Sequence, residues 1–255
     1  MPRSILADRP APEWLIDESF EERQIGVIKS GKEAEVFLVE RRSATGRCLL
    51  AHKRFRPRHP KRGELRELGF SKGTIYRHDI SYRQNWHMNS RDRRAVETKT
   101  AYGQGVTARL WPANEFEMLR RAWNAGASVP YPVGRTDDGI LMEYVGDRSQ
   151  AAPRLVNASL DGVGLAAAWE QLLDAVRRLA GEGIVHADLS VYNLLWWDGR
   201  LVLIDFPQAI DAVTNPDASE LLRRDLVNVA TWFERRGVAI DLESVYADLV
   251  ISLLF

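Results

Sequence analysis

The chain has 255 residues, of which 45% are hydrophobic and 27% charged, a composition that excludes a disordered chain and suffices for one large core or two lobes around a cleft. The single cysteine, Cys48, excludes an intrachain disulfide framework, and no run reaches the ~20 apolar residues of a membrane-spanning helix. Such sparse cysteine usage favours a reducing compartment, so we expect a cytoplasmic globular protein, and one with no membrane partner. Its formal net charge is zero.

The first regular structure is predicted after a Pro-rich start. Clusters of Val, Leu and Phe between turn signals at Ser30-Gly31-Lys32 and Ala44-Thr45-Gly46 indicate antiparallel strands. The expected strands cover residues 25–29, 34–41 and 47–54.

A basic segment follows the third strand. Residues 53–94 contain 13 Lys or Arg against 4 Asp or Glu, with aromatic residues interspersed among the arginines. Residues 57–107 have many glycines and little periodicity, which favours a flexible, partly helical insertion. The basic region 53–94 is either a solvated loop, with hydroxyl groups open to phosphorylation, or a surface for RNA.

The second half of the chain is mostly helical in pattern. A helix is expected from Pro112, with Phe116, Leu119 and Trp123 on one face, followed by the turn VPYPVG and a buried strand at 139–146. Further helices are expected at 165–183 and 218–237, each with an apolar stripe ending near a glycine. The C-terminal LVISLLF is either packed on the large lobe or exposed, and packing is the better expectation.

This succession predicts an α+β protein with a small β-rich N-terminal lobe and a larger helical C-terminal lobe. We expect an N-terminal extension at 1–24 and one domain at 25–255, with lobes at about 25–140 and 146–255.

The stretch IVHADLSVYNLLWWDGRLVLIDFPQA (184–209) carries the strongest chemical signal. Asp198-Gly199 predicts a hairpin of strands 194–197 and 201–204, which returns Asp205 to the level of Asn193. Asp188 lies five residues before Asn193, the spacing of a phosphotransferase catalytic loop followed by a metal-binding aspartate. Asp188 is therefore expected to handle the nucleophile's proton, and Asn193 with Asp205 to hold Mg²⁺ or Mn²⁺. Each residue alone has an ordinary structural explanation; their joint offsets favour the catalytic one.

The catalytic stretch resembles that of the RIO family of atypical protein kinases, whose signature is similar to H-x-D-L-S-x-x-N followed by I-D-x-x-Q. The matching residues here are HADLSVYN and Asp205-Phe206-Pro207-Gln208. Conventional kinases have DFG where this chain has DFP. Two later stretches resemble further RIO segments, AAPRLVNASL and NPDASELLRRDLVNVATWF. The resemblance therefore covers about residues 25–236. No winged-helix segment is recognisable, which makes the first RIO subgroup the better comparison.

The resemblance implies the remaining site residues. SGKEAEVF (30–37) resembles the RIO phosphate-covering loop S-T-G-K-E-A-x-V-Y, although Lys29 departs from that pattern by preceding Ser30-Gly31. Lys53 is the expected phosphate-binding lysine, and RLWPANEFEMLRRAW selects Glu115 as its partner. GILMEYVG is the expected hinge. The implied ATP-binding residues are Ser30, Gly31, Lys32, Glu33, Glu35, Val36, Lys53, Glu115, Met142, Glu143 and Val145, and the implied catalytic residues are Asp188 and Asp205.

We expect ATP-dependent phosphorylation of protein Ser or Thr hydroxyls, including autophosphorylation, with an unidentified protein substrate. A second function within the family is an ATPase switch in which Asp205 takes the phosphoryl group. The spacing of Asp188, Asn193 and Asp205 also fits a small-molecule phosphotransferase of the aminoglycoside-kinase type, and the fold alone fits a non-catalytic module that binds RNA or protein. The resemblance further implies RNA or a ribosomal particle as a partner of the basic 53–94 region.

Overall fold

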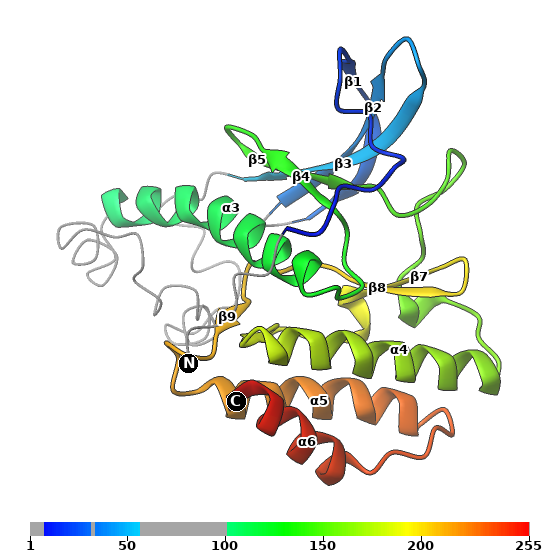
Figure 1. Cartoon of the computed structure of the whole chain (residues 1–255), viewed down its shortest axis with the longest axis vertical. Helices are drawn as coiled ribbons and strands as arrows, with labels where there is room; N and C mark the ends of the chain where they lie inside the picture. The colour runs from blue at the N-terminus through cyan, green and yellow to red at the C-terminus, as the bar shows by residue number, and fades with distance from the viewer. Residues whose placement is uncertain (1–7, 32–33, 57–100, 255) are drawn as a thin grey trace, which may run out of the picture.

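The computed structural model describes residues 8–31, 34–56 and 101–254, and gives side-chain surroundings for all of these except 101–111 and 254. Figure 1 shows a β-sheet at one end of the molecule and a layer of long helices at the other. This arrangement confirms the expected two-lobed α+β fold. Most of the predicted basic insertion, residues 57–100, lies outside the described residues, so its proposed flexibility and RNA binding stay predictions.

The N-terminal lobe is built on a five-stranded antiparallel sheet of order β1-β2-β3-β5-β4. Its strands are β1 (Glu21–Ser30), β2 (Ala34–Arg42), β3 (Arg47–Phe55), β4 (Pro132–Arg135) and β5 (Gly139–Glu143). The three strands expected in the first 54 residues are confirmed, although β1 begins earlier, at Glu21. The prediction of a simple turn for VPYPVG was wrong, because strand β4 forms there. Pro132 is tolerated because it is the first residue of an edge strand.

Helix α3 (Ala101–Asn124) lies beside the sheet and faces the C-terminal lobe (Figure 1). It begins before the expected start at Pro112, which lies inside it. A proline removes one backbone donor from a helix but does not always end it. The predicted inner face is correct: Leu119 and Trp123 are buried, and Phe116 packs against the same core.

The C-terminal lobe contains the helices α4 (Gly162–Gly181), α5 (Ala218–Glu234) and α6 (Leu242–Leu254). Asp161 begins α4 by accepting a hydrogen bond from the amide of Gly164 at 2.7 Å. Leu249 and Leu253 of α6 are buried against the other helices, which confirms packing for this part of the C-terminal segment. Among the described residues, no helix combines the length and apolarity needed to cross a bilayer.

Short elements connect α4 to α5 and carry the polar residues of the catalytic stretch. They are β6 (Ile184–Val185), the 3₁₀ helix η3 (Val191–Asn193), β7 (Leu194–Trp197), β8 (Arg200–Leu203) and β9 (Ile210–Asp211). A second 3₁₀ helix, η2 (Leu155–Asn157), precedes α4. Strands β7 and β8 form the predicted hairpin, and β6 pairs with β9.

Candidate active site

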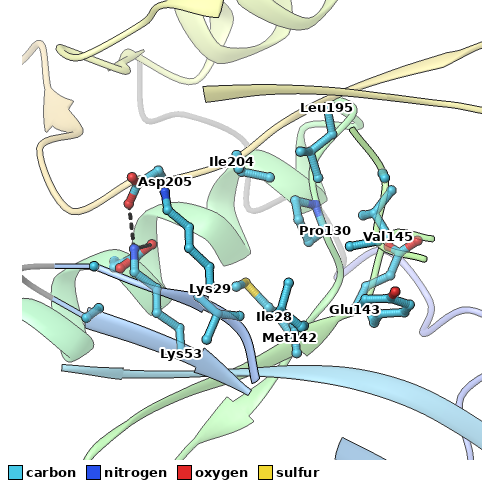
Figure 2. A pocket seen from close by; sticks show the side chains of 18 of the residues that line it. Ile28, Lys29, Lys53, Pro130, Met142, Glu143, Val145, Leu195, Ile204 and Asp205 are labelled. Carbon is cyan, nitrogen blue, oxygen red and sulfur yellow. Dashed lines mark hydrogen bonds and ion pairs between the residues drawn. The ribbon is translucent and has the colours of Figure 1, made fainter. Parts of the chain in front are cut away.

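A cavity of about 440 Å³ lies between the sheet and the C-terminal lobe. Apolar side chains, among them Ile28, Met142, Val145 and Leu195, line much of it (Figure 2). Charged groups converge on another part of its wall. The predicted residues that line it are Gly31, Val36, Lys53, Glu115, Met142, Glu143, Val145 and Asp205. The cavity therefore brings together residues that are distant in sequence.

Lys53 is the centre of the charged group. Its Nζ contacts Glu115 Oε1 at 2.7 Å and Asp205 Oδ1 at 2.5 Å, the second contact being drawn in Figure 2. Burial alone lowers the pKa of Lys53, but the charges of Glu115 and Asp205 outweigh burial and raise it. Lys53 is therefore a permanent cation that joins a strand of the sheet, helix α3 and the end of the β7–β8 hairpin.

The two carboxylates respond differently to this lysine. Burial raises the pKa of Glu115 despite the nearby charge of Lys53, and Glu115 also accepts a bond from the amide of Phe206 at 3.3 Å. Asp205 is also subject to a burial effect that raises its pKa, but the charge of Lys53 outweighs it, and the net pKa is lowered. Asp205 thus stays an anion at neutral pH.

The hairpin places Asp205 by local backbone geometry. Asp198 and Gly199 both have positive φ, 49° and 71°, as the two-residue turn requires. At the other end of the hairpin the amide of Ile204 donates to the carbonyl of Asn193 at 2.9 Å, as expected from the sequence. Asp205 itself has φ of 74°, a costly conformation for a residue with a side chain, which is typical of functional sites.

Hydrogen bonds from side chains to the backbone hold the loop that carries Asp188. Asn193 Nδ2 donates to the carbonyl of Asp188 at 2.8 Å and lies 3.3 Å from Asp188 Oδ2, while the Asp188 side chain is exposed. His186 is buried, with Nε2 3.1 Å from the carbonyl of Ile204, and burial lowers its pKa. Neither Asp188 nor Asn193 lines the cavity, although Asn193 is hydrogen-bonded to Ile204, which does.

Asp225 of α5 supports the same loop; the sequence comparison matched this aspartate but gave it no role. Its Oδ2 accepts a bond from the amide of Ala187 at 2.7 Å, and Arg224 donates to the carbonyl of Ala187. Ala187 has φ of 61°, so these contacts hold a strained residue directly before Asp188. The resemblance of the α5 segment to a RIO sequence pointed to this helix without assigning the aspartate a role.

The turn between β1 and β2 is tied by polar contacts. Ser30 Oγ donates to Glu35 Oε1 at 3.0 Å. The guanidinium of Arg56 donates to Ser30 Oγ and to Glu35 Oε1, each at 2.8 Å. The amide of Gly31 donates to the carbonyl of Ala34 at 2.9 Å. Ser30 and Glu35 hold the turn rather than line the cavity. Lys32 and Glu33 lie outside the described residues, and their expected phosphate contacts stay predictions.

The expected hinge lies at the apolar part of the cavity. Met142 and Ala51 are paired across β3 and β5 and both line the cavity. The amide of Glu143 donates to the carbonyl of Tyr131 at 2.8 Å, and the carbonyl of Val145 accepts from Ala152 at 2.9 Å. The amide of Val145 has no backbone partner in the described part of the chain. The strand itself ends at Glu143, so the prediction that it continues to 146 was wrong.

A divalent cation fits the donor set. Lys53 contacts Oδ1 of Asp205, and Oδ2 has no hydrogen-bond partner among the described residues. Asn193 bonds Asp188 through its Nδ2, which keeps the amide oxygen separate from that contact. A carboxylate and an amide oxygen are ligands that Mg²⁺ and Mn²⁺ accept. No cluster of three or more His, Cys, Asp or Glu suited to a metal occurs in the described residues, so a cation here needs further ligands.

An antiparallel sheet with a Lys53–Glu115 ion pair, joined by a cleft to a helical lobe that carries Asp188 and Asp205, defines a protein-kinase-like fold. The family model of the RIO domain matches residues 74–245, more than half of the chain. The chain belongs to the RIO domain family.

Curated relatives agree with this assignment. The RIO-type serine/threonine-protein kinase Rio1 of Haloferax volcanii is 41% identical over 145 residues, which cover 57% of this chain and 49% of that protein. The protein of the same name from Thermoplasma acidophilum is 35% identical over 137 residues, covering 53% and 70%. A probable serine/threonine-protein kinase RIO1 homolog of Encephalitozoon cuniculi is 28% identical over 223 residues, covering 84% and 54%. The chain thus spans about half the length of the first and third of these relatives.

Proposed function

We propose that this chain transfers the γ-phosphoryl group of ATP to serine or threonine hydroxyls of a protein, its own included. The observation that carries the proposal is the Lys53 contact with both Glu115 and Asp205 at the cleft. The names of the relatives, serine/threonine-protein kinases, support the same activity. Phosphoryl transfer needs positioning and charge stabilisation more than covalent chemistry, and these residues supply both.

Each residue has a proposed part in this reaction. Lys53, positioned by Glu115, binds the phosphates, and the turn at Ser30 and Gly31 covers them. The adenine ring lies against Met142, with the backbone of Glu143 and Val145 at its edge. Asp188 orients the hydroxyl and accepts its proton. Asn193 and Asp205 hold Mg²⁺ or Mn²⁺, which neutralises phosphate charge when bound.

The test is ATP turnover and self-labelling with Mg²⁺ and with Mn²⁺. We expect Asp188→Asn to lose at least about 100-fold in turnover, the scale of general-base catalysis, and Asp205→Asn to lose metal-dependent turnover. Asp198→Asn is the matched control, because this exposed turn residue has a positive φ that Asn accepts readily. Equal activity in all variants would contradict the site assignment. A hydroxylamine-labile label on the protein would replace the kinase proposal with an aspartyl-phosphate ATPase.

A cytoplasmic location is a further proposal from the sequence. RNA or a ribosomal particle as partner of the basic 53–94 region is likewise a proposal. Deleting 57–94 is expected to remove any salt-sensitive RNA affinity.

A further inference from the structure

Two cations of the cavity wall have no part in the function proposed above. They are Lys29 of β1, in the N-terminal lobe, and Arg154, directly before η2, in the C-terminal lobe. Both line the same cavity as Lys53 and Asp205. The two side chains therefore reach one space from opposite lobes.

A backbone irregularity directs Lys29 to the cavity. Val27 pairs with Phe37 and Lys29 with Val36, so the β1–β2 register shifts around Ile28. Neighbouring residues of a regular strand point to opposite faces, yet Ile28 and Lys29 both line the cavity. Figure 2 shows the side chain of Lys29 extending toward Asp205. A β-bulge that redirects a side chain beside a functional site accounts for this placement.

The backbone around Arg154 is fixed against the catalytic hairpin. Arg154 forms an isolated β-bridge with Leu195, and the carbonyl of Pro153 accepts a bond from the amide of Trp196 at 3.0 Å. The carbonyl of Arg154 accepts from the amide of Asn157 at 2.8 Å. The guanidinium is thus attached to a rigid part of the C-terminal lobe.

The protein gives these two cations little counter-charge. Lys53 is ion-paired with Glu115 and Asp205, whereas neither Lys29 nor Arg154 has an ion-paired partner within the described part of the chain. Partial burial lowers the pKa of Lys29, and the charges of Arg154 and Lys53 lower it further, against an opposing effect of Asp205. Two like charges held near each other in a cavity favour an anion between them.

We propose that Lys29 and Arg154 form an interlobe clamp on the polyphosphate chain of the bound nucleotide. The cavity combines an apolar wall, suited to a base, with this cationic pair, which matches a nucleoside di- or triphosphate. The clamp rests on the proposed function, since it requires nucleotide in this cleft. It adds two positive charges from residues outside the Lys53–Glu115 pair, and it lets the polyphosphate bridge the two lobes directly.

The experiment compares affinities for ATP, ADP and adenosine in Lys29→Met, Arg154→Met and the double variant, by calorimetry on the full chain with Mg²⁺ and with EDTA. Each single variant is expected to weaken ATP binding about tenfold, the scale of one charge-assisted contact, and to leave adenosine binding unchanged. Arg23→Met is the matched control, because Arg23 is an exposed cation on the same strand that does not line the cavity. Its ATP affinity should equal that of the wild type.

The ratio of ATP to adenosine affinity decides the result. A ratio that falls in both cleft variants and stays constant in Arg23→Met supports the clamp. An unchanged ratio overturns the clamp but leaves the proposed function intact, provided that the wild type binds ATP. Equal losses for ATP and adenosine also overturn it, because they indicate a structural effect of the substitution. No binding of any nucleotide by the wild type overturns both the clamp and the proposed function.

Discussion

Asp225 illustrates how one buried group sets the pH response of the catalytic loop. Its side chain is only 1% exposed, and burial raises its pKa to about 7 against the opposing effects of Arg224 and of the backbone amides of Leu189 and Ala187. An aspartate in an unfolded chain has a pKa of about 3.9. Because the folded-state pKa is the higher one, folding favours the protonated form. Its stabilising contribution is full below about pH 4 and is lost as the pH rises toward 7.

We predict that Asp225→Asn flattens the dependence of stability on pH between 4 and 7. Asparagine stays neutral and keeps an oxygen that accepts from the amide of Ala187. The wild type should lose up to about 1.4 kcal/mol of unfolding free energy per pH unit relative to the variant. Urea unfolding at a series of pH values measures this difference.

Asp137→Asn is the control, because Asp137 is exposed in the turn between β4 and β5. Its unfolding free energy should follow that of the wild type at every pH. Parallel curves for Asp225→Asn and the wild type would show that Asp225 titrates alike in the folded and unfolded states.

Residues of the site could be predicted where the chemistry lies in a short stretch. Asp188, Asn193 and Asp205 are recognisable because a local turn at Asp198-Gly199 fixes their relation. Arg154 gave no such signal, because its place in the cavity depends on a bridge to Leu195 across 41 residues of sequence.

Lys29 was noticed only as a departure from a motif. Strand alternation cannot place it in the cavity, since the register shift at Ile28 depends on pairing with β2. The same limit explains the missed β4, whose short, Pro-containing sequence becomes a strand only by pairing with β5. The local sequence patterns thus carry no information about strand pairing between distant segments.

At the scale of elements, the segment before β1, residues 8–20, contacts both the sheet and helix α3. Arg41 of β2 is buried and donates to the carbonyl of Ile16 at 2.7 Å and to Glu22 Oε1 at 2.8 Å, and its guanidinium lies 3.8 Å from the centre of the Phe20 ring. Farther toward the N-terminus, Arg9 lies over the ring of Trp123 in α3 at 4.1 Å. The segment therefore joins the sheet to the helix that carries Glu115.

Substituting Arg41 should loosen this segment. We predict that Arg41→Met lowers the free energy of unfolding by about 2–3 kcal/mol, because it removes charge-assisted hydrogen bonds and leaves the carbonyl of Ile16 without its donor. Limited proteolysis should then cut within residues 8–20 sooner than in the wild type. Unfolding in urea and mass analysis of the fragments measure the two effects.

Arg42→Met provides the matched comparison. Arg42 is the next residue on β2, its side chain is 59% exposed, and it pairs with Glu40 at 2.6 Å. Glu40 keeps a second cation, Arg148, at 3.6 Å after this change. The loss of the exposed Arg42 should therefore cost about 0–1 kcal/mol, and the variant should stay close to the wild type in both measurements. Equal effects of the two substitutions would contradict a special role for Arg41.

At the scale of the whole molecule, the hydrophobic core does not follow the lobe boundary. The largest cluster of buried residues joins the C-terminal half of α3, Ile140 of β5 and the helices of the C-terminal lobe. The sheet has a separate small cluster of Val39, Cys48, Leu50 and Leu141, and β1 is mostly exposed. Glu115 is thus held by the large core, whereas its partner Lys53 lies on the more weakly packed sheet.

This division predicts different local stabilities, and it predicts which part nucleotide binding protects. Strands β1 and β2 should exchange their amide hydrogens faster than α4 and α5, since fewer buried contacts oppose their opening. ATP with Mg²⁺ contacts both lobes in the proposed function, so it should slow exchange in β1–β3 and near Val145, with little effect on α6. Hydrogen–deuterium exchange with mass spectrometry resolves these segments. Lys53→Met should lose most of the ATP-dependent protection. Protection that is spread evenly over both lobes would contradict the prediction, because it would show that nucleotide does not act mainly on the more weakly packed sheet.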